Sequence, residues 1–581
     1  MKSYIKYILT IPYILLTLTS CFDTKIKDGD YTFEIYATND IHGRFFDSLY
    51  VSSLDGHLVN KHSLASIATV IEDSRAKAGD DNVILLDIGD HLQGDNAAFY
   101  FNFIDTVSPH IFPRIANYMR YDAVVVGNHD IETGHNVYDR VKDQFDMPYL
   151  AANALISDSD NLYFEPYTII KRHGLKIAVI GMTNPNIPSW LAPEIWSGMY
   201  FEEIVPSLQR WISYVREKES PHFLIVAMHA GLGDEDKDDI ENPARYVTKH
   251  IKGIDLVFAS HDHRVTAEKH FNGDKEVWLL EGGARASNLS RATLSLSIID
   301  GSVAAMNVEA ETLKIEGIEP SVEYMSKFRE DFLAVKHFTN RIIGTLENDI
   351  DSRDAYFGPS SYVDMIHSVQ LRASGADISF VAPLSFNKHI SKGELNYQNL
   401  LDIYPFENQL NVIELSGEEI KNYLEYSYSL WVNPNPSQSN HLLNFNDGVG
   451  ERFRLKNPHY NFDSAAGIIY EVDITKPVGQ RVIIKSMTNG DIFDFAKKYN
   501  VALTSYRASG GGDLLTNGAD IDKDDLQSRI VSRLSDIREV IYDQLQADGK
   551  ISAEKRNEWK FIPEPLVKRL SQKDYKEMFG M

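Results

Sequence analysis

The feature that most constrains this chain is a set of five apolar runs, each followed at once by side chains that can bind a metal ion. The runs cover residues 31–38, 82–88, 121–126, 223–228 and 254–259. Apolar runs of this length, bounded by polar turns, are typical of buried strands. In open α/β sheets, ligands bind where the strands end at their carboxyl edge. We therefore expect the five polar segments to converge on one edge of one sheet.

The polar segments share a content of aspartate, asparagine and histidine. They read Asp40-Ile41-His42, Gly89-Asp90, Gly127-Asn128-His129-Asp130, His229 and His261-Asp262-His263. Such ligands, without cysteine, suit divalent ions such as zinc or manganese, and also cobalt. Seven candidate ligands are too many for one ion and fit two ions bridged by one carboxylate. Asp40-Ile41-His42 or His229 alone is weak evidence, and Gly127-Asn128-His129-Asp130 is fairly specific. All five in order, each after a predicted strand, indicate a site.

Two divalent ions have a defined use in catalysis. Ions about 3.5–4 Å apart can stabilise both the attacking and the leaving oxygen of an in-line displacement. A water held by them loses its proton near neutral pH and becomes the nucleophile. The formal net charge of −25 argues against binding a nucleic acid polymer. It does not exclude small phosphorylated substrates, because bound ions supply positive charge locally.

The length of 581 residues predicts more than one hydrophobic core. Between residues 31 and 314, apolar runs alternate with stretches of helical spacing, which is typical of a layered α/β domain with flanking helices. Residues 315–340 are predicted to form a linker helix, and residues 341–545 a smaller α/β domain. Residues 546–581 form a charged tail of no indicated role. Nothing in the sequence indicates an oligomeric state.

The N-terminus has the layout of a signal peptide. Lys2 and Lys6 precede an apolar stretch, and Leu18-Thr19-Ser20-Cys21 follows it. These four residues resemble the bacterial lipoprotein cleavage box, and Cys21 is the only cysteine of the chain. We expect residues 1–21 to be a lipoprotein signal and the mature chain to be lipid-anchored at Cys21 in the bacterial cell envelope. The lipid would be its only membrane contact. A plain secretory signal is the alternative.

The ordered motif set resembles the calcineurin-like metallophosphoesterases and, more narrowly, the 5′-nucleotidase family, over residues 31–545. The resemblance implies that one ion is held by Asp40, His42 and His263, that the other is held by Asn128, His229 and His261, and that Asp90 bridges them. It also implies that His129 lies beside the phosphate, where it stabilises developing charge or assists the leaving group. Glu132 occupies the position of an aspartate that pairs with this histidine. Ser260 stands where the family usually has glycine.

The second domain should select the substrate. In the family it contributes two aromatic rings that sandwich a nucleobase. The matching segments are 404–408, with Phe406 and Asn408, and 505–513, with Tyr506 and Asp513. The resemblance makes Phe406 and Tyr506 the candidate clamp, beside the polar Asn408, and Asp513 a candidate acceptor for a ribose hydroxyl. The chain has 28 Phe and 30 Tyr, so the alternative is that both rings belong to the core.

One departure points to a particular branch of the family. Asn387 occupies the position of an arginine that helps 5′-nucleotidases hold the phosphate, and Lys388 either replaces its charge or is merely exposed. The segments 381–390, 460–477 and 505–507 look closer to the 2′,3′-cyclic-nucleotide 2′-phosphodiesterase/3′-nucleotidases. The expected function is hydrolysis of nucleotide phosphoesters, cyclic, 3′ or 5′. The alternatives are a UDP-sugar hydrolase and a non-enzymatic surface-binding lipoprotein on the same fold.

Overall fold

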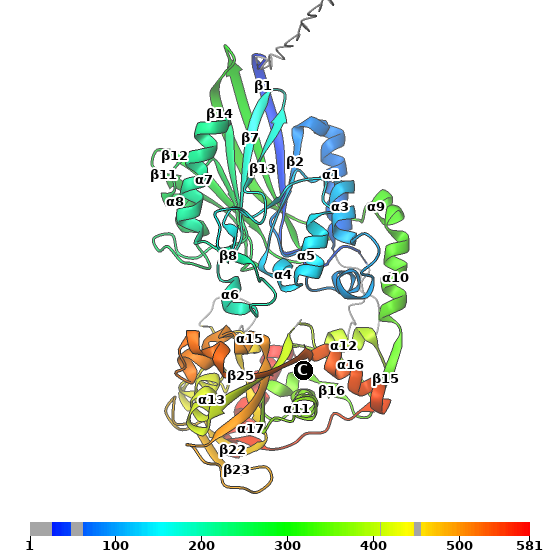
Figure 1. Ribbon diagram of the computed structural model, residues 1–581, viewed down its shortest axis with the longest axis vertical. Helices are drawn as coiled ribbons and strands as arrows, with labels where there is room; N and C mark the ends of the chain where they lie inside the picture. Colours follow the sequence, from blue (N-terminus) through cyan, green and yellow to red (C-terminus); the bar gives the residue numbers. More distant parts are fainter. Residues whose placement is uncertain (1–25, 48–61, 407, 447–454, 581) are drawn as a thin grey trace, which may run out of the picture.

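The computed structural model describes residues 26–47, 62–406, 408–446 and 455–580, which form an N-terminal and a C-terminal α/β domain (Figure 1). Cys21 and the predicted signal peptide lie outside the described residues. Among the helices of the described ranges, none has both the length and the apolar character needed to cross a membrane.

The first domain contains two six-stranded sheets, with the strand orders β14-β13-β1-β2-β3-β4 and β11-β12-β10-β9-β7-β6. The strands of the first sheet are β1 (Gly29–Thr38), β2 (Val83–Asp87), β3 (Ala123–Val125), β4 (Tyr149–Leu150), β13 (Asn288–Ile299) and β14 (Ser302–Lys314). Those of the second are β6 (Tyr167–Arg172), β7 (Leu175–Met182), β9 (Phe223–Met228), β10 (Leu256–Phe258), β11 (Val265–Asn272) and β12 (Lys275–Gly282). Strands β1, β2 and β3 of the first sheet run parallel to one another, and so do β7, β9 and β10 of the second, whereas β13 pairs antiparallel with β1.

The two sheets pack face to face, and helices cover their outer faces. Phe33 of β1 and Ile225 of β9 share a core between the sheets. On the other face of β9, Leu224 packs with α7 (Ile204–Glu219) and α8 (Ala244–His250). Helices α1 (Leu64–Ala78) and α3 (Ile111–Met119) cover the first sheet. The predicted strands read as continuous apolar runs because both faces of each sheet are buried.

The expectation of a single sheet was wrong. Three of the five metal-type segments follow β1, β2 and β3 of the first sheet, and the other two follow β9 and β10 of the second. An apolar run indicates that a strand is buried, but it carries no information about which sheet the strand joins. The segments still meet, because the carboxyl ends of both sets of strands lie at the same end of the sandwich.

Two short helices connect the domains where a single linker helix was expected. They are α9 (Val322–Lys327) and α10 (Arg329–Thr339), and the backbone leaves the helical conformation at Phe328 between them. Helix α10 runs along one side of the molecule from the first domain to the second (Figure 1).

The second domain is built on a five-stranded sheet with the order β21-β17-β24-β20-β25. Its strands are β17 (Ile378–Val381), β20 (Gln409–Ser416), β21 (Ser464–Ala466), β24 (Lys498–Thr504) and β25 (Ile530–Asp536). Its main helices are α11 (Ser361–Ser374), α12 (Tyr397–Ile403), α13 (Gly417–Trp431), α15 (Ser505–Ala508) and α16 (Ile537–Asp548). The segment after α16 is part of this fold: β27 (Trp559–Ile562) pairs with β22 (Ile468–Asp473), and α17 (Glu564–Phe579) follows it.

The two-sheet core predicts a large stability difference between two isoleucines of the first domain. Ile225 is fully buried between the sheets, whereas Ile299 at the end of β13 is 58% exposed. Ile225→Ala should lower the free energy of unfolding by about 2–5 kcal/mol, because it leaves a cavity. Ile299→Ala should change it by less than about 0.5 kcal/mol. Urea unfolding followed by circular dichroism measures both, and equal effects would contradict the shared core.

Candidate metal centre

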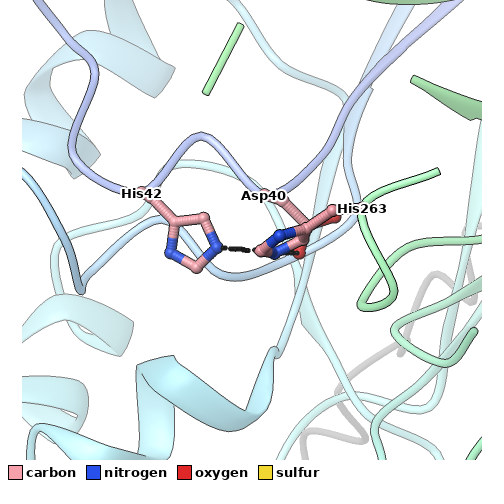
Figure 2. Close-up of side chains that lie close together, drawn as sticks. All are labelled: Asp40, His42 and His263. Atoms are coloured by element: carbon pink, nitrogen blue, oxygen red, sulfur yellow. Dashed lines mark hydrogen bonds and ion pairs between the residues drawn. The ribbon is translucent and has the colours of Figure 1, made fainter. Parts of the chain in front are cut away.

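The turns after β1, β2, β9 and β10 bring two groups of side chains together. Asp40, His42 and His263 form the first, and their ligand atoms all lie within 4.8 Å of one another. Figure 2 shows these three side chains directed toward one another, with His42 close to His263. Asp90, His229 and His261 form the second group by the same criterion. Residues more than two hundred positions apart in the chain thus share one site.

The first group directs three ligand atoms toward one another. Nδ1 of His42 lies 3.0 Å from the carbonyl oxygen of Gln93 and donates to it, so the lone pair is on Nε2. That Nε2 lies 3.0 Å from Nε2 of His263, which lies 3.5 Å from Oδ1 of Asp40. Oδ1 of Asp40 is buried and has no hydrogen-bond partner among the described residues. An ion between these atoms would satisfy all three, so the residues fit a divalent metal.

Asn128 completes the second group. Its Oδ1 lies 3.1 Å from Nε2 of His229 and 2.9 Å from Nδ1 of His261. Nε2 of His229 also lies 3.1 Å from Oδ2 of Asp90. Nδ1 of His229 lies 2.7 Å from the Ile88 carbonyl oxygen and donates to it, which turns the lone pair on Nε2 toward the group. All seven predicted ligands are therefore in these two groups.

Burial and mutual charge set the protonation of the ligands. Burial lowers the pKa of His42 to about 3, so the ring is neutral, as a ligand must be. Burial alone would raise the pKa of Asp90, but His229 and His129 hold it well below its usual range. Asp90 is therefore an anion between two sets of imidazoles, as a bridging ligand requires.

The backbone at this site adopts a conformation that side chains rarely tolerate. Five of the seven candidate ligands have positive φ: Asp40 (47°), His42 (49°), Asp90 (59°), His261 (88°) and His263 (59°). Left-handed backbone outside glycine costs on the order of 1–3 kcal/mol per residue, and it concentrates at functional sites. The strain aims these side chains at a common centre.

Asp130 ties the turn after β2 to the turn after β3. Its carboxylate accepts N–H groups from Asp90, His91 and Leu92, each at 3.0 Å, and from Gly127 at 2.8 Å. Gly127 leaves no room for a side chain, since a Cβ there would lie 2.2 Å from Oδ1 of Asp90. Asp130 ends a segment that the sequence singled out, but its supporting role needed the structure.

His129 adjoins both groups: its ring centroid lies 5.5 Å from that of His42, its backbone N–H donates to Asp90, and its side chain pairs with Glu132. His129 and Glu132 both lie on α4 (Asn128–Glu132), where Nδ1 of His129 hydrogen-bonds to the Glu132 carboxylate. The longer carboxylate at this position therefore still reaches the histidine. Burial opposes protonation of His129, but the negative charges of Asp90 and Glu132 outweigh it and raise the pKa to about 10. The ring is a cation that can stabilise developing negative charge or donate a proton.

A cavity of about 1640 Å³ separates the metal-type residues from the second domain and is lined by both. On one wall lie Asn128, His129, Glu132, His261 and His263. On the other lie Asn387, Lys388, Phe406, Asn408 and Tyr506. The structure thus brings three of the four predicted substrate residues to the cavity. It does not bring Asp513 there, because Asp513 is exposed and lies outside the cavity lining.

The predicted clamp rings are half-buried on the cavity wall. Tyr460, which the sequence reading did not assign to the site, joins them, with its ring centroid 6.4 Å from that of Phe406. Arg507 anchors this region: its guanidinium pairs with Asp463 at 2.9 Å and donates to the Gly511 carbonyl oxygen at 2.9 Å. Lys388 is not a free cation, because its Nζ lies 2.7 Å from Asp402.

Two further residues that the sequence did not reveal orient His261. Nε2 of His261 lies 3.1 Å from a carboxylate oxygen of Glu241. The ring of Trp190, at the end of α6 (Ile187–Trp190), stacks on His261 with centroids 5.3 Å apart. Trp190 lies in a short helix and Glu241 in a loop, and neither belongs to a metal-type segment, so no local pattern marked them.

Comparisons with known proteins agree with this geometry. Residues 33–265 match the family model described as calcineurin-like phosphoesterase, and residues 342–517 match the 5′-nucleotidase C-terminal domain. A 2′,3′-cyclic-nucleotide 2′-phosphodiesterase/3′-nucleotidase of Haemophilus influenzae is 24% identical over 92% of this chain and 88% of its own. A 5′-nucleotidase of Vibrio cholerae is 23% identical over 71% of this chain and 79% of its own.

Solved structures share the whole two-domain fold. A Staphylococcus aureus protein solved with alpha-ketoglutarate superposes with a TM-score of 0.74 at 21% identity, over 91% of this chain and 99% of its own. The 5′-nucleotidase precursor of Thermus thermophilus gives 0.62 at 19% identity, over 92% and 100%. At these identities the likeness shows the fold alone. With both domain models matched in order, the chain belongs to the calcineurin-like phosphoesterases that carry a 5′-nucleotidase C-terminal domain.

Proposed function

We propose that this protein is a dinuclear-metal phosphoester hydrolase that releases phosphate from nucleotides, acting as a 2′,3′-cyclic-nucleotide phosphodiesterase and 3′-nucleotidase. The observation that carries the proposal is one cavity with two groups of metal-type ligands on one wall and half-buried aromatic rings on the other. The ligand set is complete, which favours an enzyme over a binding protein that has lost its catalytic residues. The similarity to the H. influenzae enzyme over most of both chains supports the choice of substrate.

The ligand residues have separate tasks in this proposal. Asp40, His42 and His263 would hold one zinc or manganese ion. Asn128, His229 and His261 would hold the other ion, and Asp90 would bind both. Bound there, the ions would activate a water molecule and polarise the phosphate. The carbonyl partners of His42 and His229 accept the Nδ1 protons, which fixes the ring orientation and aims each Nε2 at the ions.

His129 would act on the leaving group. Its cationic ring faces the cavity, and Glu132 fixes its orientation. A cation held there stabilises the negative charge that develops on the departing oxygen, and its proton can pass to that oxygen.

Asn387 supports the cyclic diester as the preferred ester. A phosphate monoester carries about −1.5 to −2 charges at pH 7, whereas a cyclic diester carries a single negative charge. The position that would present a guanidinium here presents a neutral amide, and the neighbouring Lys388 is paired with Asp402. At this one position the wall is therefore better matched to the less charged ester.

The size of the cavity favours a second candidate, hydrolysis of a nucleotide sugar such as a UDP-sugar. Ligand pockets commonly measure about 300–1,000 Å³. The cavity here, at about 1640 Å³, leaves room for a larger leaving group than a nucleoside.

A substrate panel tests the proposal. Purified protein should release phosphate from 3′-AMP, open 2′,3′-cyclic AMP, and turn over 5′-AMP and a UDP-sugar more slowly. EDTA should abolish activity, and added Zn²⁺ or Mn²⁺ should restore it. Asp90→Asn should lower the rate more than about 100-fold, since even the loss of an outer-shell partner costs 10–100-fold. Asp274→Asn, at an exposed residue in the turn between β11 and β12, is the control. Asp90→Asn turnover within a few-fold of wild type would refute the proposal.

Base stacking gives a separate prediction. Phe406→Ala and Tyr506→Ala should each raise KM for nucleotides about 5- to 150-fold, because stacking on an aromatic side chain contributes about 1–3 kcal/mol per base. Steady-state kinetics with 3′-AMP and with para-nitrophenyl phosphate, which has no base, separate binding from chemistry. Asp513→Ala, outside the cavity lining, should leave both unchanged. If the ring variants impair both substrates equally, the rings are structural.

We also propose that the protein is lipid-anchored at Cys21 in the cell envelope of its bacterium. Full-length protein expressed in a bacterial host should partition with membranes, and Cys21→Ala should move it to the soluble fraction after fractionation and immunoblotting. Ser20→Ala keeps the cysteine and should remain with the membranes. A Cys21→Ala protein that stays membrane-bound would rule out the anchor.

A further inference from the structure

Ser260 is a buried serine whose hydroxyl contacts a ligand from each of the two metal-type groups. It lies two residues after the end of β10, is fully buried, and precedes His261. Its Oγ lies 2.6 Å from Oδ2 of Asp40, in the first group, and 3.1 Å from Nδ1 of His229, in the second. The hydroxyl therefore lies behind the site, between the two groups.

The donors and acceptors around Ser260 allow one proton arrangement. The Ile88 carbonyl oxygen can only accept, so Nδ1 of His229 carries a proton and shares it between Ile88 and Ser260. The Asp40 carboxylate is an anion and also only accepts, so the Ser260 hydroxyl donates to it. The chain runs from His229 Nδ1–H to Ser260 Oγ–H to Asp40 Oδ2. The other ligand atom of each residue, Nε2 of His229 and Oδ1 of Asp40, then points toward its metal-type group.

We propose that Ser260 is a positioning residue that couples the two metal sites, because one hydroxyl orients a ligand of each ion. This inference rests on the proposed function in one respect, that the protein binds two ions. Partners of metal ligands outside the coordination shell typically change metal affinity by 10–100-fold when removed. A residue that supports ligands of both sites should change both affinities, whereas a residue behind one ligand should change one.

The chain offers two matched comparisons. Asn39 Nδ2 donates to Oδ2 of Asp40 at 2.7 Å and so supports only the first group. Ser379 in the second domain has a similar environment without a metal-type site: it is fully buried, and its Oγ lies 3.0 Å from His367 Nδ1 and 2.8 Å from Gln370 Oε1. Ser379→Ala therefore controls for the loss of a buried hydroxyl between a histidine and an acceptor.

Metal titration of the chelator-stripped full chain tests the coupling. Isothermal titration calorimetry with Mn²⁺ should give two sites in the wild type. Ser260→Ala should weaken both 10–100-fold, Asn39→Ala only one, and Ser379→Ala neither. Ser260→Thr keeps the hydroxyl and should recover most of the affinity. Ser260→Gly, with no side chain to repack, gives the same measurement if Ser260→Ala does not fold.

The outcomes separate this inference from the proposed function. Two unchanged affinities in Ser260→Ala and Ser260→Gly, or the weakening of one site alone, would overturn the coupling and leave the hydrolase proposal intact. A wild type that binds fewer than two ions would overturn both. Weakening of both metal affinities in Ser260→Ala, with recovery in Ser260→Thr, would establish that Ser260 couples the two sites.

Discussion

The face-to-face packing of two sheets is the constraint on which the rest of this structure depends. Each sheet supplies only part of the ligand set, the first through the turns after β1, β2 and β3 and the second through the turns after β9 and β10. The shared apolar core holds the carboxyl ends of both sets of strands at one end of the sandwich. The apolar core thus keeps the strand ends rigid, and the polar, strained site depends on that rigidity.

That rigidity lets the site keep an unfavourable backbone. Asp40 and His42 have positive φ, yet their N–H groups donate to the carbonyl oxygens of Gly89 at 3.0 Å and Asp90 at 2.9 Å. These bonds tie the turn after β1 to the turn after β2, and Asp130 ties the latter to the turn after β3. The ligands are therefore oriented before any ion arrives, which reduces the reorganisation that binding requires.

The second domain holds its wall of the cavity in place through a different kind of network. Arg507 is buried and joins Asp463 and the Gly511 carbonyl oxygen, beside the cavity rings Tyr460 and Tyr506. A buried guanidinium with a bidentate carboxylate is costly to break, so it holds the loops on which the rings depend. The candidate metal ligands and the candidate clamp rings thus rest on separate cores that meet at one cavity.

The sequence by itself determined the fold class and all seven candidate ligands. Apolar runs indicate buried strands, and the aspartate, asparagine and histidine residues that follow them indicate candidate ligands. The family resemblance, and no local pattern, made His129 with Glu132 and Phe406 with Tyr506 candidates for the site. Only the tertiary structure decided that two sheets form the site, that Asp513 lies away from the cavity, and that Ser260, Glu241, Trp190 and Tyr460 belong to it. The reason is physical: Ser260 and Asp40 are 220 residues apart, and no local pattern encodes which distant side chains packing brings together.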